Sequence, residues 1–190
     1  PATLVQLNTV VNNGGDIRSA IALPNLELAR ETVIGVQGNW ALSVAELSLG
    51  NRQAALRAID LGQSELERLT RSLEGQRINQ DGLFWLNARL VRQRGRIQAE
   101  SGDYAGAVAS FDDAIAKLTA TTGSGTFAPD DPAVAELRLE RASIIDRARR
   151  PAAEIDAAYV GALDAMLSAR EASSGFSTGL LHPYLDRLAG

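Results

Sequence analysis

The sequence predicts an all-α protein of antiparallel helix pairs, with about eight or nine helices and no sheet. Aromatic residues make up only 5% of the 190 residues, and Ala, Leu, Arg and Glu dominate, which favours helices over strands. The hydrophobic share of 45% is enough for a sizeable core. A pattern of glycine, a polar residue and then alanine occurs three times along the chain, and apolar residues follow it at helical spacing.

The three glycine segments are interpreted as turns between helices. They begin at Gly15, Gly50 and Gly102, which are 35 and 52 residues apart. Glycine ends a helix well because a left-handed backbone costs least without a β-carbon. The polar residue that follows can cap the next helix by accepting a backbone N–H bond, and the alanine lets two helices approach closely. The capping residues are Asp16, Asn51 and Asp103, and the contact residues are Ala20, Ala55 and Ala107.

The third segment resembles a tetratricopeptide (TPR) repeat across residues 89–118. The match rests on residues from both helices of the repeat, namely Gly95, Gly102, Asp103, Tyr104, Ala107, Phe111 and Ala114. Looser matches are formed by Trp40, Val44, Leu47, Gly50 and Ala55, and by Leu4, Leu7, Val11, Gly15, Ala20 and Leu28. The resemblance implies an α-solenoid of stacked helix pairs. The alternative is a generic bundle of helical hairpins.

The chain also departs from the TPR pattern. Trp40 lies one residue nearer its glycine than in the family, and no repeat has the usual closing proline. Pro24 falls in the second helix of the first repeat, where we expect it to kink or end that helix. The 52-residue spacing exceeds the roughly 34 residues of a TPR repeat. The resemblance implies repeats near 1–34, 37–72 and 85–118, and a degenerate pair over 132–171.

Capping and turn residues predict the remaining boundaries. We expect one long helix over 52–73, loops over 74–81 and 119–131, and helices over 132–149 and 151–171. Pro132 suits the first position of its helix. Residues 173–190 are expected to form a linker and a short terminal helix. Because the chain lacks a starting methionine and an obvious stop, it is interpreted as a piece of a longer protein with a further C-terminal region.

The last residues carry a second resemblance. Residues 179–188 read Gly-Leu-Leu-His-Pro-Tyr-Leu-Asp-Arg-Leu. They look like the junction that follows the repeats in bacterial proteins with a caspase-like peptidase domain, the TPR-associated CHAT domain. The His–Cys pair of such a domain would lie outside this chain, because the chain has no cysteine.

No catalytic residue, metal site or cofactor is predicted. Without cysteine there are no disulfides, thiolate nucleophiles or cysteine zinc sites. The single histidine, His182, has no cysteine or second histidine to work with, so we expect a structural or solvated role for it. Neighbouring helical residues point about 100° apart, so Asp112 and Asp113 do not converge on one reacting atom. Asp131 is better explained as a helix cap, and residues 123–126 as a flexible loop.

Three arginines form the predicted binding site. Arg89, Arg92 and Arg96 lie within a stripe of about 60° on the first helix of the best repeat. In TPR arrays this helix lines the concave groove. Residues 85–101 contain four arginines against one glutamate, on a chain of net charge −4. Because arginine forms two parallel bonds to a carboxylate, an acidic peptide or a C-terminal carboxylate fits this stripe. The alternative is a solvated helix face, or arginines paired with nearby acids.

These observations predict a non-catalytic interaction module that binds a protein or peptide in its groove. The alternative is the sensor or packing half of a TPR–CHAT protein whose peptidase domain lies elsewhere. The mildly acidic charge argues against nucleic acid as a partner, and no apolar run approaches the roughly 20 residues of a membrane span. Trp40 is expected in the core rather than as a ligand platform. The compartment, cytoplasmic or exported after removal of a signal peptide, and the oligomeric state stay open.

Overall fold

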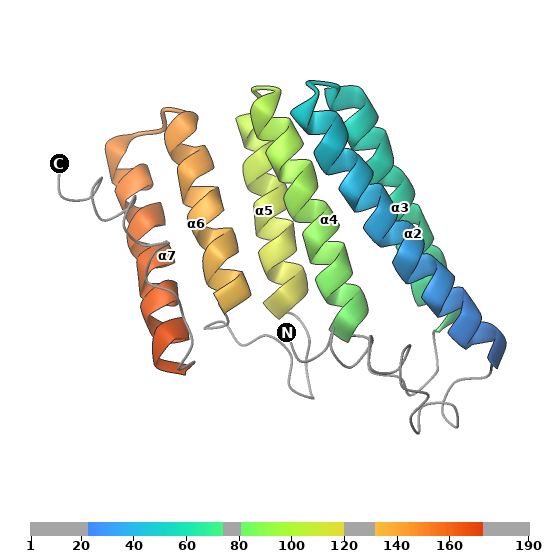
Figure 1. Cartoon of the computed structure of the whole chain (residues 1–190). Helices are drawn as coiled ribbons and strands as arrows, with labels where there is room; N and C mark the ends of the chain where they lie inside the picture. The colour runs from blue at the N-terminus through green and yellow to red at the C-terminus, as the bar shows by residue number, and fades with distance from the viewer. Residues whose placement is uncertain (1–22, 74–80, 120–131, 173–190) are drawn as a thin grey trace. The chain divides into compact units, whose positions relative to one another are not determined.

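The computed structural model describes residues 23–73, 81–119 and 132–172, and every regular element in these ranges is a helix (Figure 1). The helices are α2 (Leu23–Ser48), α3 (Arg52–Ser72), α4 (Asp81–Glu100), α5 (Tyr104–Thr119), α6 (Pro132–Arg147) and α7 (Ala152–Ala172). No strand occurs in the described ranges, which confirms the all-α class for them. The predicted features at Gly15, Asp16, Ala20, Asp131 and His182, and over 74–80, 120–131 and 173–190, lie outside the described residues.

Contacts divide the chain into two compact units, Pro1–Ile97 and Gln98–Gly190. In the first unit, α2 and α3 form an antiparallel hairpin and lie side by side (Figure 1). Their apolar faces and one face of α4 enclose a single hydrophobic core. Its most deeply buried residues are Val36, Ala55, Ile59, Leu69, Leu90 and Ile97. The predicted helix over 52–73 is confirmed as α3, whose C-terminal cap is Leu73.

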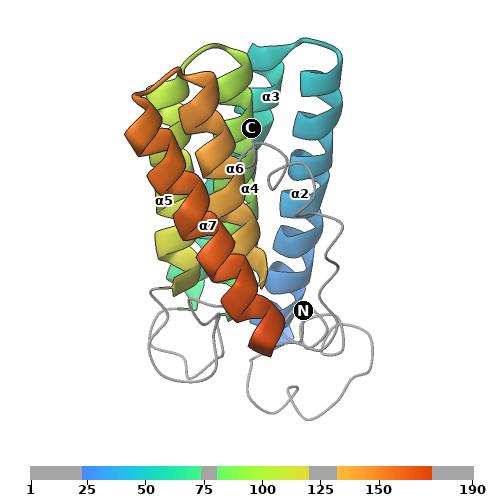
Figure 2. The same ribbon diagram turned by 90° about the vertical axis from the view of Figure 1, so that its left-hand side faces the viewer.

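In the second unit, α6 packs against both α5 and α7, and Figure 2 shows α7 inclined across α6. The core between α6 and α7 consists mainly of alanines around three larger side chains, Leu139, Tyr159 and Met166. Small side chains allow a short distance between helix axes. The predicted core positions Ala107, Phe111 and Ala114 of α5 are all fully buried, which confirms them.

The predicted glycine turns are confirmed at Gly50 and Gly102. Both glycines have a left-handed backbone, with φ of 79° and 81°. In the first turn the amide of Asn51 donates to the carbonyl of Glu46 at 2.8 Å, and the second turn has the corresponding bond at 2.9 Å. This pattern is the Schellman motif, which satisfies the last carbonyls of a helix. Both preceding helices therefore end at the positions that the glycines predict.

The turn between α6 and α7 has the same geometry without a glycine. Arg149 has φ of 53°, and the amide of Arg150 donates to the carbonyl of Ile145 at 3.4 Å. The sequence predicts a helix through Arg149, but α6 ends at Arg147 because the chain turns into the left-handed region two residues later. A β-carbon makes this conformation costly.

Only one of the two predicted helix caps in the described ranges forms. Asp103 accepts a hydrogen bond from the amide of Gly106 at 2.9 Å, as predicted. Asn51 lies at the cap position of α3 but makes no capping bond, so that prediction is wrong. Its side-chain amide instead donates to the carboxylate of Glu46 at 2.8 Å. The backbone of Asn51, with φ −81° and ψ 62°, is outside the extended conformation from which a cap side chain reaches the helix.

The expected boundary between the first two repeats is not found. It falls between residues 34 and 37, and α2 runs without a break from Leu23 to Ser48. Pro24 does not end or kink a helix, because it is the second residue of α2. The amide that proline lacks has no partner within the helix at this position, so proline is tolerated there. The expected start at Pro132 is confirmed by α6.

Candidate functional site

The three arginines of the candidate site follow one side of α4. This side lies about 100° around the helix from Leu86 and Leu90, which face the core of the first unit. Arg89 and Arg92 are half-buried, and Arg96 is exposed. The exposure of the three side chains therefore increases along α4, from half-buried at Arg89 and Arg92 to exposed at Arg96.

Arg89 is held between aromatic rings. Its guanidinium carbon lies 3.5 Å from the centroid of the Trp40 ring on α2 and 5.3 Å from that of Trp85 on α4. At such distances the positive charge is attracted to the ring faces. Trp40 is half-buried and packs against the core of the first unit, as predicted. The sequence does not show the contact between Trp40 and Arg89, through which the ring supports a candidate binding residue.

The contact between Trp40 and Arg89 belongs to a tightly packed seam between α2 and α4. Val36, Gln37, Trp40, Leu86, Arg89 and Leu90 surround a space that has no room for a water molecule. Burial in this seam, reinforced by the positive charge of Arg92, lowers the pKa of the Arg89 guanidinium from its ordinary value. Burial and Arg92 thus disfavour the charged form of Arg89, whereas the two tryptophan rings favour it.

The fourth arginine of this part of α4 lies on the other flank of the helix. Arg94 donates to both the carboxylate of Asp60 and the amide oxygen of Gln63, two residues of α3. It is an ion-pair partner that ties α3 to α4. The spacing of the sequence separates Arg94 from the stripe, but its partners are more than 30 residues away and cannot be read from periodicity.

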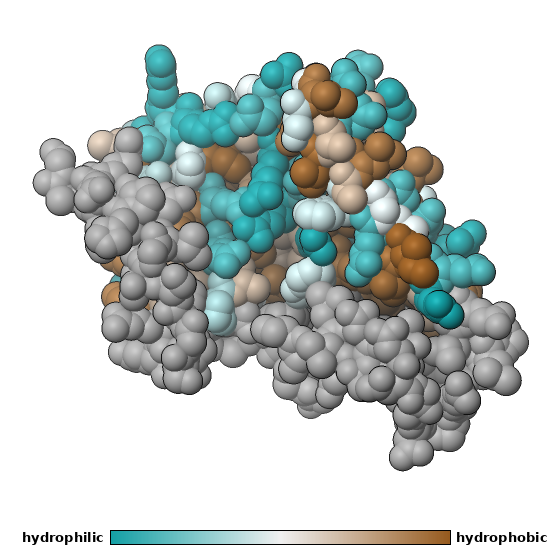
Figure 3. Space-filling view, viewed as in Figure 1, coloured by the Kyte–Doolittle hydropathy of each residue, from teal (hydrophilic) through white to brown (hydrophobic). Residues whose placement is uncertain are grey.

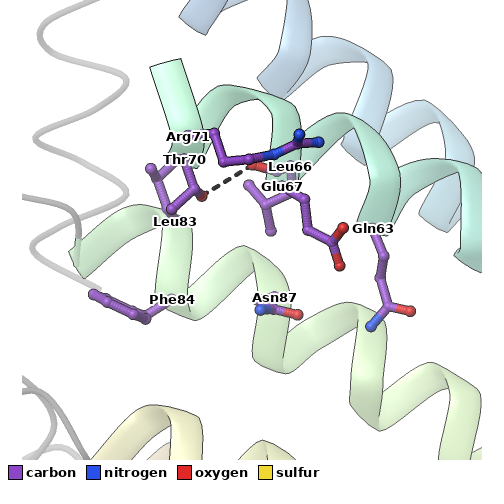
Figure 4. Close-up of a pocket in the computed structure, with 8 residues that line it drawn as sticks. All are labelled: Gln63, Leu66, Glu67, Thr70, Arg71, Leu83, Phe84 and Asn87. Carbon is purple, nitrogen blue, oxygen red and sulfur yellow. Dashed lines mark hydrogen bonds between the residues drawn. The ribbon is translucent and has the colours of Figure 1, made fainter. Parts of the chain in front are cut away.

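A groove lies between α3 and α4 on this second flank, with a volume of about 360 Å³ (Figure 4). Its residues are Gln63, Leu66, Glu67, Thr70, Arg71, Leu83, Phe84 and Asn87. Figure 4 shows Gln63 and Glu67 extending from α3 toward α4, with Phe84 and Asn87 on the α4 side. The hydroxyl of Thr70 donates to the Leu66 carbonyl at 2.9 Å. The groove thus combines apolar side chains with amide, carboxylate and guanidinium groups.

A second hollow, of about 540 Å³, lies in the second unit between the start of α5 and the α6–α7 turn. Its charged side chains already have partners within the protein. Asp103 caps α5, and Arg150 pairs with Glu154 at 3.1 Å. The charged groups of this hollow are therefore engaged within the protein, which makes them less available to a ligand.

The neighbouring acids Asp112 and Asp113 diverge, as predicted. Asp112 accepts two bonds from the guanidinium of Arg141 on α6, at 2.6 and 3.2 Å. Asp113 pairs with Lys117 one turn later on α5, at 2.9 Å. Each carboxylate is thus engaged in a different ion pair, and the two do not face a common point.

Comparison with protein-family models, with curated proteins and with solved structures finds no match in any of the three. Within the described ranges, no helix is long and apolar enough to cross a membrane. No group of three or more potential ligands in those ranges is arranged to hold a metal ion.

Proposed function

We propose that this chain is a non-catalytic, TPR-like interaction module that binds an acidic protein segment along the Arg89–Arg92–Arg96 face of α4. The observation that carries the proposal is the environment of Arg89. Its guanidinium is fixed on the Trp40 ring, and its strongest electrostatic neighbour is another arginine. A carboxylate placed beside Arg89 and Arg92 would relieve their repulsion.

Stacking on tryptophan leaves the hydrogen-bonding edge of the Arg89 guanidinium available to a ligand. The attraction to the ring acts through the flat face of the guanidinium, whereas its N–H groups lie in the plane and point outward. A ring that fixes this plane also fixes the direction of the hydrogen bonds, so less conformational entropy is lost on binding. Arg89 is therefore preorganised for a carboxylate, and the more exposed Arg96 extends the same charged face along α4.

The interaction role also agrees with the scaffold. Helical hairpins present continuous surfaces along their helices, and repeat arrays of hairpins use such surfaces to bind extended partner segments. The alternative role, as part of a TPR–CHAT protein, depends on residues 179–188, which lie outside the described ranges. No observation in the described ranges favours it over a general interaction module.

Tryptophan fluorescence tests the proposal directly, because the two tryptophans of the chain are both next to Arg89. We expect an oligoglutamate peptide to change the emission in a saturable way, and an oligolysine peptide of equal length to leave it unchanged. Raising the salt concentration from about 0.05 to 0.5 M should weaken the binding, since exposed charges are screened over a shorter distance.

The matched variants are Arg92→Glu in the stripe and Arg57→Glu on α3. Both reverse one charge of the first unit, but Arg57 is an exposed residue outside the stripe. We expect Arg92→Glu to weaken oligoglutamate binding at least about tenfold and Arg57→Glu to change it less than about threefold. Equal effects of the two variants would show that net charge alone drives the binding, and the proposed site would be wrong.

A further inference from the structure

One face of α2 is apolar and exposed along most of the helix. The residues of this face, called the α2 stripe below, are Ile34, Gly38, Ala41, Leu42 and Ala45, together with Leu49, which directly follows the last residue of α2. Its large members are exposed by 61%, 49% and 74% for Ile34, Leu42 and Leu49. At about 100° per residue, the six residues fall within about 100° of the helix surface. In Figure 3, hydrophobic surface gathers over the position that α2 has in Figure 1.

Part of the corresponding face of α4 is buried by helix packing. Aligning Gly50 with Gly102 shifts the numbering by 52, so that four residues of the α2 stripe correspond to Leu86, Leu90, Gln93 and Ile97. These four residues of α4 are between 0% and 2% exposed, and the three apolar ones belong to the core of the first unit. Leu42 and Leu49 correspond instead to Arg94 and Ser101, which are not buried. One edge of the α2 stripe therefore occupies a position at which α4 packs against other helices.

The α2 stripe is also complementary to itself in the antiparallel direction. Ile34 and Leu49 exchange places when the order of the residues is reversed about the midpoint between Ala41 and Leu42, and so do Gly38 and Ala45. A large residue of one copy then meets a large residue of the other at each end, and small residues meet between them. Small residues near the middle allow two helix axes to approach closely.

The pairing of Ile34 with Leu49 and of Gly38 with Ala45 holds in both directions between two copies. A symmetric dimer requires this kind of self-complementary surface, since residue i contacts residue j and j contacts i.

We propose that the α2 stripe is the interface of an antiparallel homodimer, with its two-fold axis between Ala41 and Leu42. The apolar part extends about 22 Å along α2, from Ile34 to Leu49. An interface of this length is smaller than that of an obligate dimer, so its dissociation constant is expected in the micromolar range. The proposal concerns a face of α2 other than the arginine stripe of α4, and its test is independent of peptide binding.

Sedimentation equilibrium of the full chain, from about 5 to 500 µM, tests the proposal. We expect a reversible monomer–dimer equilibrium. Leu42→Arg should weaken it at least about tenfold, because it places two arginines at the two-fold axis. Leu61→Arg is the matched control, since Leu61 is an equally large residue of α3 that is 57% exposed outside the stripe. It should leave the dimer unchanged.

The absence of cysteine allows a crosslinking test of the antiparallel register. Under mild oxidation, Ala41→Cys should form a disulfide between two copies more than about tenfold faster than Leu61→Cys.

Either of two results would overturn the homodimer: a wild-type chain that remains monomeric up to the highest concentration, or a Leu61→Arg variant that is as disruptive as Leu42→Arg. A monomer that loses stability in Leu42→Arg but not in Leu61→Arg would assign the α2 stripe to a segment of the same chain, and would equally overturn the proposal.

Discussion

The guanidinium carbon of Arg89 lies 3.5 Å from the centroid of the Trp40 ring, although the two residues belong to different helices and are 49 positions apart in the chain. This contact connects α2 to α4 at the edge of the core. It also fixes the plane of a guanidinium on a positively charged helix face. Folding and the proposed binding would thus depend on the same side chain, and variants that keep the charge separate the two.

Arg89→Lys keeps the charge but removes the planar group that stacks on tryptophan. We expect it to lower the free energy of unfolding by about 0.5–1 kcal/mol, because a lysine ammonium on a flexible stem replaces the stack poorly. Arg96→Lys is the matched control, since Arg96 is exposed on the same helix, and its effect should stay within about 0.5 kcal/mol. Urea unfolding followed by tryptophan emission measures both. Equal losses would mean that the stack contributes nothing to stability.

Ala107→Leu places a larger side chain where no space remains, because Ala107 is fully buried in α5. We expect a loss of about 1–3 kcal/mol in the free energy of unfolding from the strain of overpacking. Ala105→Leu makes the same change at an exposed position two residues earlier, where the effect should remain within about 0.5 kcal/mol. A stable Ala107→Leu variant would show that the α5 contact has room to adjust.

Features set by local backbone chemistry could be predicted from the sequence. Gly50 and Gly102 indicate left-handed helix ends, and Pro132 indicates a helix start, because each depends on one residue and its near neighbours. The burial of Ala55 and Ala107 follows from helical periodicity. The same reasoning fails at Pro24, because a proline near a helix start and one in a helix interior look alike until the start of the helix is known.

Features that depend on contacts between distant residues could not be predicted. The stripe of Arg89, Arg92 and Arg96 was visible as a pattern, but the stacking of Arg89 on Trp40 requires α2 and α4 to meet. The pairing of Arg94 with Asp60 likewise depends on how α3 packs against α4. Periodicity assigns these residues to a face of one helix. It does not say which residue of another helix lies opposite.

Gly102→Ala tests the cost of a left-handed helix end. A β-carbon added to Gly102 would meet no atom within 4 Å, so the expected loss of about 1 kcal/mol comes from the backbone, whose φ is 81°. Gly161→Ala is the control, because this glycine of α7 also has open space but an ordinary helical backbone. It should gain about 0.5–1 kcal/mol from helix propensity. A change of the same sign in the free energy of unfolding of both variants would contradict this prediction.

Arg149→Gly should raise the stability of the protein. Arg149 has the conformation that Gly50 and Gly102 have at the other two helix turns, but it carries a β-carbon. A left-handed backbone costs an L-residue roughly 1–2 kcal/mol, and glycine removes this cost. Part of the resulting gain is lost, because glycine also makes the unfolded chain more flexible. We therefore expect a net increase of about 0.5–1 kcal/mol in the free energy of unfolding.

Arg149→Ala separates the backbone effect from the loss of the charged side chain. It keeps the β-carbon, so it should leave stability within about 0.5 kcal/mol of the wild type. If alanine stabilised the protein as much as glycine, the gain would come from removing the exposed arginine, and the strain at the α6–α7 turn would have no measurable cost.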